Sequence, residues 1–289
     1  MNALTVLAPA KINLCLSVLG KRPDGYHDVE MLMQMVGLYD EVTVSLAGAG
    51  ISVTCDDGTA PSGRGNIAWK AAEAILSRSD GKRGLAVTIK KAIPTAAGLG
   101  GGSSDAAAVL AAANKLLGTG FDRVQLAEIG AGIGMDVPFF FNGPLALAQG
   151  RGETLTRLAA LSNFWVLLVN PGFETSTAWV YKNLNLRLTK NAGCNKIAGF
   201  TVRNIALRLH NDLETVTAVA HPVITRIEEA LLAHGAAGAR MSGSGPTVFG
   251  IFEDEDGCRA AAAGLSGNGW RIYPVEALTA SPLEVYHTP

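Results

Sequence analysis

The stretch PTAAGLGGGSSD, residues 94–105, decides what this chain can build. It holds four glycines and two serines and runs directly into an alanine-rich segment that ends at Leu117. Glycines let backbone amides approach a ligand closely, and a helix that starts at the serines, with Ser103 as its N-cap, directs free N–H groups at whatever the loop encloses. The stretch therefore predicts an anion-binding site, with phosphate as the expected ligand. A tight turn without a ligand would use the same glycines. The helix is predicted from one apolar stripe: Ala106, Val109, Leu110, Ala113, Leu116 and Leu117.

Two common nucleotide motifs do not explain this loop. The pairs Gly20-Lys21 and Gly81-Lys82 lack the upstream glycine and the following hydroxyl residue of a P-loop. A dinucleotide fingerprint fails as well, because Gly98-x-Gly100 is followed by Ser103 where a third glycine is needed. Both P-loop and Rossmann binding are therefore disfavoured.

Composition favours a globular protein that acts on small molecules. The 289 residues are 48% hydrophobic and 17% charged, which is enough for one large or two modest domains with cores. A net charge of -1 offers no basic field for nucleic acid. The apolar residues 1–8 lack a basic flank, and the run 158–173 is too short for a membrane span, so a cytoplasmic protein without a membrane segment is expected. No obligate protein partner is indicated.

The four cysteines are far apart in the sequence. Cys15, Cys55, Cys194 and Cys258 form no C-x-x-C pair and have no histidines at metal spacing. Reduced thiols in a cytosolic protein without structural zinc are the simplest expectation.

The pattern changes near residue 160, which predicts two domains, 1–160 and 161–289, in an α+β chain. The first ninety residues are extended runs around one helix, and the end of the chain alternates helices and strands as in an antiparallel α+β module. Residues 190–200 are expected to be an irregular connection. The expected strands are 4–7, 12–19, 31–38, 42–46, 51–54, 85–89, 165–169, 247–252 and 271–275, and the expected helices are 67–76 behind a capping Asn66, 106–117, 123–129, 176–184, 223–234 and 257–265.

Three separated segments carry a family resemblance. They are APAKINL at 8–14, the glycine loop at 94–108, and ARMSGSGPTVF at 239–249. Their order and spacing are similar to the three motifs of the GHMP kinases. This resemblance implies an N-terminal domain like ribosomal protein S5 domain 2 that binds ATP, a ferredoxin-like C-terminal domain, and an active site in the cleft between them.

Further segments resemble one branch of that superfamily. They are Asp24-Gly25-Tyr26-His27, the triple glycine at 100–102, GMDVPFF at 134–140 and Asn211-Asp212-Leu213-Glu214. The branch phosphorylates the 2-hydroxyl of 4-diphosphocytidyl-2-C-methyl-D-erythritol in the non-mevalonate isoprenoid pathway. The resemblance therefore implies this small-molecule substrate with ATP and Mg²⁺ as cofactors, and no residue is assigned as a metal ligand. Another GHMP kinase acting on homoserine, mevalonate or a sugar, or a non-catalytic ATP-binding sensor, remains an alternative.

The resemblance makes Asp136 the catalytic base and Lys11 its partner. From the residues alone, Asp136 before Val137-Pro138 is more typical of a helix N-cap, and both roles can coexist. Strand alternation predicts that Lys11, Asn13, Cys15 and Ser17 share one face, which would line a cleft. Ile12, Leu14, Leu16 and Val18 are expected on the opposite face.

The remaining site residues divide between substrate and nucleotide. Asp105 is expected to be a favourable acid in the first turn of the helix, and Asp212 and Glu214 are expected to be structural. Tyr26 offers a stacking surface and His27 a donor and an acceptor for a pyrimidine edge. The predicted substrate-binding residues are Asn13, Tyr26, His27, Tyr181, Ser242 and Gly243. The predicted cofactor-binding residues are Lys91, Pro94, Thr95, Ala96, Ala97, Gly98, Leu99, Gly100, Gly101, Gly102, Ser103 and Ser104.

Overall fold

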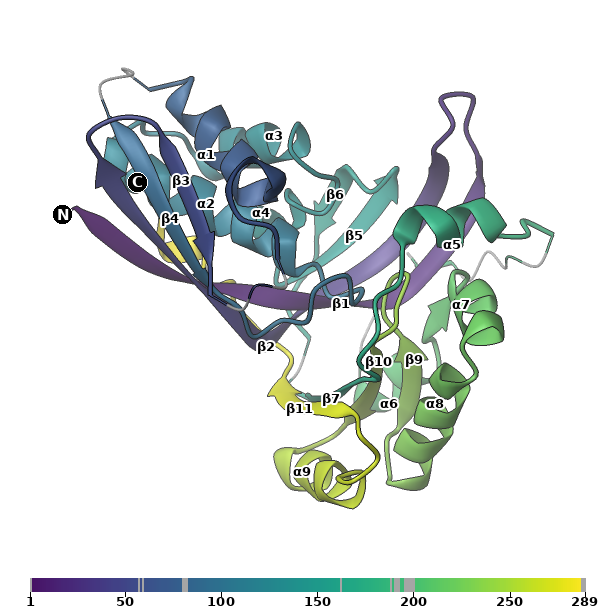
Figure 1. Cartoon of the computed structure of the whole chain (residues 1–289). Helices are drawn as coiled ribbons and strands as arrows, with labels where there is room; N and C mark the ends of the chain where they lie inside the picture. The colour runs from purple at the N-terminus through teal and green to yellow at the C-terminus, as the bar shows by residue number, and fades with distance from the viewer. Residues whose placement is uncertain are drawn as a thin grey trace.

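The computed structural model contains two β-sheets with helices packed on them (Figure 1). It describes residues 2–56, 58, 60–79, 83–161, 163–187, 189, 193, 194 and 201–286. Most of the predicted connection 190–200 therefore lies outside the described residues. Among the described residues, no helix is long and apolar enough to cross a membrane.

Two long antiparallel strands form the centre of the first, seven-stranded sheet. They are β1 (Ala3–Lys21) and β2 (His27–Ala47), joined by a hairpin that projects beyond the rest of the sheet (Figure 1). The first half of β2 pairs with β5 (Leu145–Gly150) and the second half with β4 (Gly84–Lys90). The remaining strands are β3 (Ile51–Cys55) beside β4, β6 (Thr154–Arg157) beside β5, and β8 (His210–Asn211), which runs parallel to β1.

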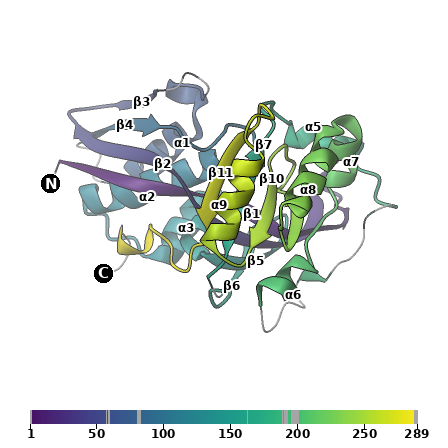
Figure 2. The ribbon, with the colours of Figure 1, turned by 90° about the horizontal axis from the view of Figure 1, so that it is seen from below.

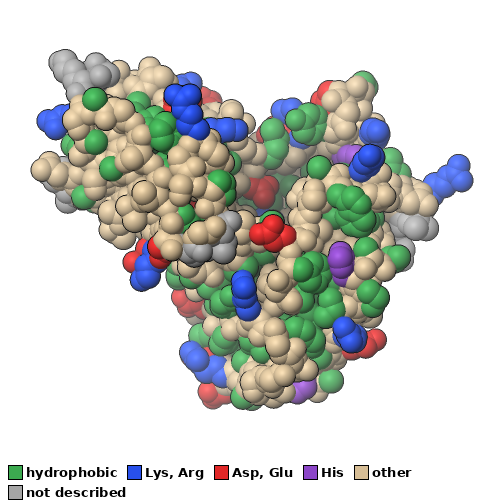
Figure 3. Space-filling view, viewed as in Figure 1, with side chains coloured by type: hydrophobic (Ala, Val, Ile, Leu, Met, Phe, Trp, Pro, Cys, Tyr) green, Lys and Arg blue, Asp and Glu red, His purple; other side chains and the backbone are tan. Residues whose placement is uncertain are grey.

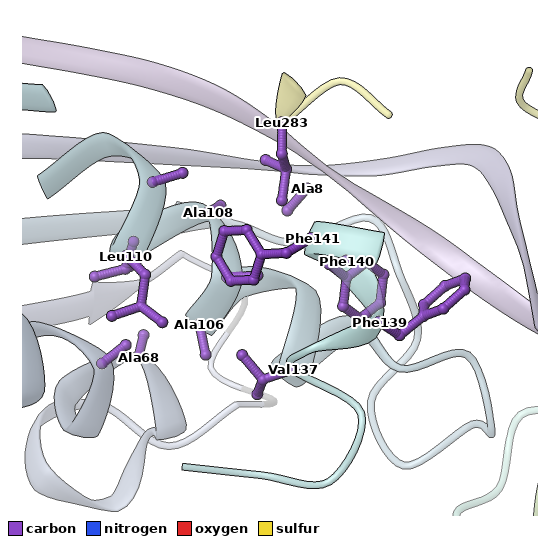
Figure 4. Packing of buried hydrophobic residues seen from close by; sticks show 14 of the residues in the cluster. Ala8, Ala68, Ala106, Ala108, Leu110, Val137, Phe139, Phe140, Phe141 and Leu283 are labelled. Carbon is purple, nitrogen blue, oxygen red and sulfur yellow. The ribbon is translucent and has the colours of Figure 1, made fainter. Parts of the chain in front are cut away.

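Helices cover one face of this sheet and enclose its core. The helices are α1 (Ile67–Leu76), α2 (Gly101–Leu117), α3 (Arg123–Ala131) and α4 (Phe139–Asn142). The alanines of α2 let it pack closely on β1 and β2, while Leu110 and the phenylalanines of α4 fill the space around it (Figure 4). Asn66 caps α1 as predicted, its side chain accepting a hydrogen bond from the amide of Ala68.

The second sheet is four-stranded and wholly antiparallel, as predicted. Helices α8 (Val223–Ala233) and α9 (Glu255–Gly264) pack on one of its faces. The other face packs against the back of the first sheet, so β1 and β2 contribute to two cores (Figure 2). The elements of this half are β7 (Trp165–Asn170), α5 (Thr177–Asn183), α6 (Val202–Ala206), α7 (Glu214–Ala220), α8 (Val223–Ala233), β9 (Gly238–Met241), β10 (Val248–Phe252), α9 (Glu255–Gly264) and β11 (Arg271–Glu276). Short 3-10 turns lie at Gly63–Gly65 and Glu284–Tyr286.

Strand alternation in β1 is broken by irregularities, which makes part of the predicted face assignment wrong. The register shifts between Pro9 and Ala10 and again between Asn13 and Cys15. Each extra residue moves the following side chains to the other face of the sheet. Leu16 therefore lines the same cleft as Lys11 and Asn13, whereas Cys15 joins Ile12 in the second core. Ser17 lies near Cys194 and is not among the residues that line the cleft.

Helix α2 begins earlier than predicted. Its first residue is Gly101 and its N-cap is Gly100, which has a left-handed backbone and no side chain that could cap. Ser103 is therefore a first-turn residue, and the expectation that it caps the helix is wrong. Because the triple glycine itself forms the start of the helix, the free amides belong to glycines, which leave space in front of them.

Two of the four cysteines are paired, contrary to the expectation of free thiols. Cys15 and Cys194 form a disulfide with their Cα atoms 5.6 Å apart. The sequence separation of 179 residues concealed the pair. Cys15 reaches its partner because the irregularity in β1 turns it into the second core.

The packing of α2 on the first sheet predicts the effect of a core truncation. Leu110 is fully buried, and Leu110→Ala should lower the free energy of unfolding by about 2–5 kcal/mol, because a cavity remains where the side chain packed. Leu207→Ala is the matched control, since Leu207 is 81% exposed and its loss should cost at most about 0.5 kcal/mol. Denaturant unfolding of both variants measures the difference, and equal costs would contradict this packing.

Candidate functional site

A cleft of about 1190 Å³ lies between the two halves of the chain. The space-filling view is hollowed between the lobe that carries α1 to α4 and the lobe that carries the hairpin and α5 (Figure 3). Its walls come from β1, the hairpin, the glycine loop with the start of α2, the turn before α4, α5, and the turn that follows β9. Segments far apart in the sequence therefore share one cavity, the usual setting for a small-molecule site.

All three sequence motifs meet at one atom, the carbonyl oxygen of Gly98. The ammonium of Lys11 donates to it at 3.0 Å, and the hydroxyl of Ser242 donates to it at 2.9 Å. The same Ser242 oxygen accepts a hydrogen bond from the amide of Asn13 at 3.2 Å. Strand β1, the glycine loop and the turn after β9 are thus joined by buried and partly buried polar contacts, which hold the floor of the cleft in one arrangement.

Two glycines of the loop are required by their geometry. Gly98 has φ +78° and Gly100 has φ +71°, a region in which side chains are strained. A Cβ on Gly98 would overlap the carbonyl oxygen of Ser242, and one on Gly100 would lie 2.9 Å from Cγ of Lys11. The loop then runs into α2, whose first residues Gly101, Gly102 and Ser103 line the cleft. The start of a helix, with its unpaired backbone amides, is an arrangement that binds anions.

Lys11 and Asp136 face each other across the floor of the cleft. The Lys11 nitrogen lies 3.7 Å from a carboxylate oxygen of Asp136 and donates to the side-chain oxygen of Asn13 at 2.7 Å. Burial lowers the pKa of Lys11, and the carboxylate of Asp136 only partly opposes that shift. The Asp136 side chain is 32% exposed, so it is open to a molecule in the cleft.

Asp136 is not the N-cap of helix α4, which was its alternative role. The N-cap of α4 is Pro138, with no side-chain hydrogen bond to the helix. Only the backbone oxygen of Asp136 contacts the helix, accepting from the amide of Phe139 at 3.2 Å. The Asp136 carboxylate is thus left available to the cleft.

Lys91 lies beneath the glycine loop, between two carboxylates. Its ammonium donates to Asp40 and, at 2.9 Å, to Asp105. Burial opposes the charge of Lys91, but the two carboxylates outweigh it and raise its pKa. The expectation that Asp105 is a favourable first-turn acid is wrong, because Asp105 lies in the second turn of α2, where it is buried and paired with Lys91.

Aromatic side chains gather at the other end of the cleft. The rings of His27 and Tyr181 stack with centroids 5.0 Å apart, which brings the predicted residue of α5 next to the hairpin. Tyr26 is 52% exposed, and the guanidinium of Arg151 lies 5.2 Å from the centre of its ring. Burial, and next the charge of Lys21, lower the pKa of His27, which favours its neutral form.

Most of the predicted site residues line the cleft, and three do not. The side chains of Leu99, Ser104 and Ser242 are buried behind its wall, although Ser242 still bonds to Gly98 and Asn13. The predicted residues that line the cleft are Lys11, Asn13, Tyr26, His27, Lys91, Pro94, Thr95, Ala96, Ala97, Gly98, Gly100, Gly101, Gly102, Ser103, Asp136, Tyr181 and Gly243.

Sequence reasoning missed several residues of the cleft and its supports. Arg151 and Lys21 bring positive charge to the hairpin end, and nothing in their local sequence separates them from surface cations. Asn211 donates to the carbonyl oxygens of Met241 and Gly243, both at 2.8 Å, and so fixes the turn after β9. The sequence motif that Asn211 forms with Asp212 and Glu214 does not by itself indicate this role.

Comparison with known proteins places the chain among kinases. The family descriptions "GHMP kinases N terminal domain" and "GHMP kinases C terminal" match residues 66–144 and 201–269. A protein named 4-diphosphocytidyl-2-C-methyl-D-erythritol kinase from Pelobacter propionicus is 51% identical over 282 residues, covering 96% of this chain and 100% of that protein. A protein with the same name from Syntrophotalea carbinolica is 52% identical over 273 residues, covering 93% and 97%.

Solved structures agree with this assignment. A crystal structure of 4-(cytidine 5'-diphospho)-2C-methyl-D-erythritol kinase superposes with a TM-score of 0.80 at 33% identity, covering 95% of this chain and 100% of that chain. Homoserine kinase from Cytophaga hutchinsonii superposes with a TM-score of 0.76 at 20% identity, covering 96% and 95%. The homoserine kinase likeness shows the fold alone.

The close contact between Gly98 and Ser242 predicts different effects for alanine at Gly98 and alanine at Gly118. Gly98→Ala should weaken MgATP binding by about tenfold or more, because the new methyl group must push the loop away from the turn that holds Ser242. Gly118→Ala is the control, since Gly118 also has a positive φ, +65°, but open space around its Cβ position. Gly118→Ala should lower the free energy of unfolding by about 1–2 kcal/mol without changing nucleotide affinity. Calorimetric titration compares them, and equal MgATP affinities would disprove the role of this contact.

Proposed function

The chain belongs to the GHMP kinases, in the branch of the 4-diphosphocytidyl-2-C-methyl-D-erythritol kinases, and on this premise we propose the following reaction. The protein transfers the γ-phosphoryl group of ATP to the 2-hydroxyl of 4-diphosphocytidyl-2-C-methyl-D-erythritol and releases ADP and the 2-phosphate. The proposal makes it a cytoplasmic enzyme of isoprenoid synthesis. It assigns residues 1–160 to the ATP-binding domain and residues 161–289 to the second domain.

The meeting of Lys11, Gly98 and Ser242 at one carbonyl oxygen carries this proposal. It sets the floor of the cleft so that helix amides lie on one side and the pair of Lys11 and Asp136 on the other. Phosphoryl transfer depends mainly on aligning the attacking oxygen with the phosphorus and on stabilising the charge that spreads over the equatorial oxygens. A cleft that holds an anion site and an open carboxylate supports that chemistry.

Asp136 would act as the general base. Its carboxylate accepts the proton of the substrate hydroxyl as the bond between oxygen and phosphorus forms. Lys11 would stabilise the negative charge of the attacking oxygen and hold the Asp136 carboxylate in place. Asn13, tied to Lys11 at 2.7 Å, would position the erythritol portion on the same side of β1.

ATP would be held by the backbone amides of residues 98–103 and by the start of α2. Among the described residues, no group of three or more histidine, cysteine or acidic side chains could hold a metal by itself. This fits Mg²⁺, which keeps several waters and is bound largely by the phosphates of its nucleotide. When bound, Mg²⁺ supplies charge neutralisation at the transferred phosphoryl group.

The aromatic end of the cleft would hold the cytidine. Tyr181 and Tyr26 offer ring faces for the base, and neutral His27 offers one donor and one acceptor to its edge. Arg151 and Lys21, which line the same end, would face the diphosphate of this substrate. Mevalonate and homoserine lack both of these groups, so this end favours the cytidylyl substrate over other GHMP substrates.

A coupled ADP-release assay tests the proposed function directly. The expected result is turnover with MgATP and 4-diphosphocytidyl-2-C-methyl-D-erythritol and none with mevalonate, homoserine or galactose run in parallel. Turnover with one of those alcohols alone would assign another GHMP activity. ATP binding without turnover on any of them would indicate a sensor that keeps the fold.

Replacing the base tests the mechanism. Asp136→Asn should lower kcat by about 10²–10⁴ while MgATP affinity stays close to that of the wild type, because the amide cannot accept the proton. Asp122→Asn is the matched control, since Asp122 caps α3 outside the cleft and asparagine caps equally well. Steady-state kinetics of the wild type and the two variants measure the difference in kcat. Near-normal turnover by Asp136→Asn would show that Asp136 is not the general base.

A further inference from the structure

One buried cluster of charges is not used by the reaction described above. It consists of Lys91 with the two carboxylates of Asp40 and Asp105, all nearly inaccessible to solvent. Two carboxylates share a single ammonium, so the cluster carries one negative charge in excess when both are ionised. Uncompensated buried charge is costly, which makes the uptake of a proton by the cluster favourable.

The cluster lies directly under the proposed phosphate loop. A Cβ on Gly101 would be 3.3 Å from the Lys91 nitrogen, so the ammonium touches the first residue of α2. Lys91 and Asp105 both line the cleft, whereas Asp40 is completely buried behind them. An anion bound at the loop amides therefore adds negative charge beside a cluster that already has an excess of it.

The hydrogen bonds identify which carboxylate takes the proton. Asp40 accepts from Lys91 and from the backbone amides of Ala92, at 2.7 Å, and Ile93, at 2.9 Å, which stabilise a carboxylate. Asp105 accepts only from Lys91, through one oxygen. Its other oxygen is buried without a hydrogen-bond partner among the described residues. That oxygen is open to protonation, because nothing has to be displaced.

Lys91 and Asp40 are the charged neighbours that shift the pKa of Asp105. Burial raises the pKa of Asp105 to about 7, with Asp40 adding to the shift and Lys91 opposing it. The faces of α1 and β1 that pack on α2 present buried apolar residues such as Ala68, Ala71 and Ala8. Lys70 and Glu73 of α1 are exposed to solvent. Lys11 of β1 lies near Gly100, toward Asp136.

We propose that binding of a nucleoside di- or triphosphate at the glycine loop is coupled to the uptake of one solvent proton by the Asp105 carboxylate. The proton bonds to the free oxygen of Asp105, and no other bond is made or broken. The cluster then becomes neutral, and the full positive charge of Lys91 is balanced by Asp40 alone while the phosphates lie above it. The coupling rests on the proposed function, since it requires the loop to be the nucleotide site.

The sign of the linkage follows from the added charge. Bound phosphate disfavours the Asp105 carboxylate and so raises its pKa further above about 7. Protons are then taken up on binding at pH values between the free and bound values, and nucleotide affinity falls as the pH rises through that window. A rise of one pKa unit corresponds to uptake of about half a proton at the midpoint.

Calorimetric titration in buffers with different ionisation enthalpies measures this uptake. The probe is MgADP in excess Mg²⁺, so that the ligand itself does not titrate, at a pH slightly above 7. The wild type should take up about half a proton per nucleotide more than Asp105→Asn. In that variant Lys91 keeps Asp40 as its partner, and the other titratable groups of the cleft, such as Lys11, Asp136 and His27, are unchanged.

Glu228→Gln is the matched control. Burial raises the pKa of Glu228 to about 8, with Glu214 adding to the shift, but Glu228 is not among the residues that line the cleft. This variant should show the same proton uptake as the wild type. Equal uptake by the wild type and Asp105→Asn would overturn the inference, whereas absence of MgADP binding by the wild type would overturn the proposed function itself.

A measurement on the wild type alone covers the case in which Asp105→Asn does not fold. For a one-unit shift, the dissociation constant for MgADP should increase by about fourfold as the pH rises from 7 to 8.5. An affinity independent of pH over this range would overturn the inference.

Discussion

The carbonyl oxygen of Gly98 is the atom on which the arrangement of the cleft depends. It accepts hydrogen bonds from Lys11 on the first strand and from Ser242 in the turn after β9, so three segments separated by more than eighty residues converge there. A partly buried carbonyl with two donors, one of them charged, is costly to disrupt because each donor would lose a partner. The loop, the lysine and the turn therefore hold one geometry relative to one another.

That junction in turn requires the irregular course of β1. A regular strand would keep one set of alternating residues on one face along its whole length. The register shifts let β1 serve the helix-covered core at both ends and the second core in the middle, with Lys11 and Asn13 facing the cleft in between. Placing these two side chains at the centre of the fold gives them a rigid support, which a surface loop could not provide.

Local sequence patterns predicted many of the helices and strands. The face assignments and the disulfide depend on contacts between residues that are distant in the sequence. The cap at Asn66, the helix at 223–234 and the C-terminal antiparallel sheet follow from short-range chemistry and periodicity, and the structure confirms them. The face of Leu16 and the pairing of Cys15 depend on register shifts, which leave no signal in the residues themselves. The pKa of Asp105 depends in part on Asp40, which lies sixty-five residues earlier in the sequence. That shift could not be predicted without the fold.

A crystal structure with a non-hydrolysable ATP analogue and 4-diphosphocytidyl-2-C-methyl-D-erythritol tests the central claim most directly. We expect the phosphates on the amides of residues 98–103, the 2-hydroxyl within hydrogen-bond distance of Asp136, and the cytosine beside Tyr26, His27 and Tyr181. The Gly98 junction should be unchanged. Phosphates bound away from the loop, or a reactive hydroxyl out of reach of Asp136, would contradict this account.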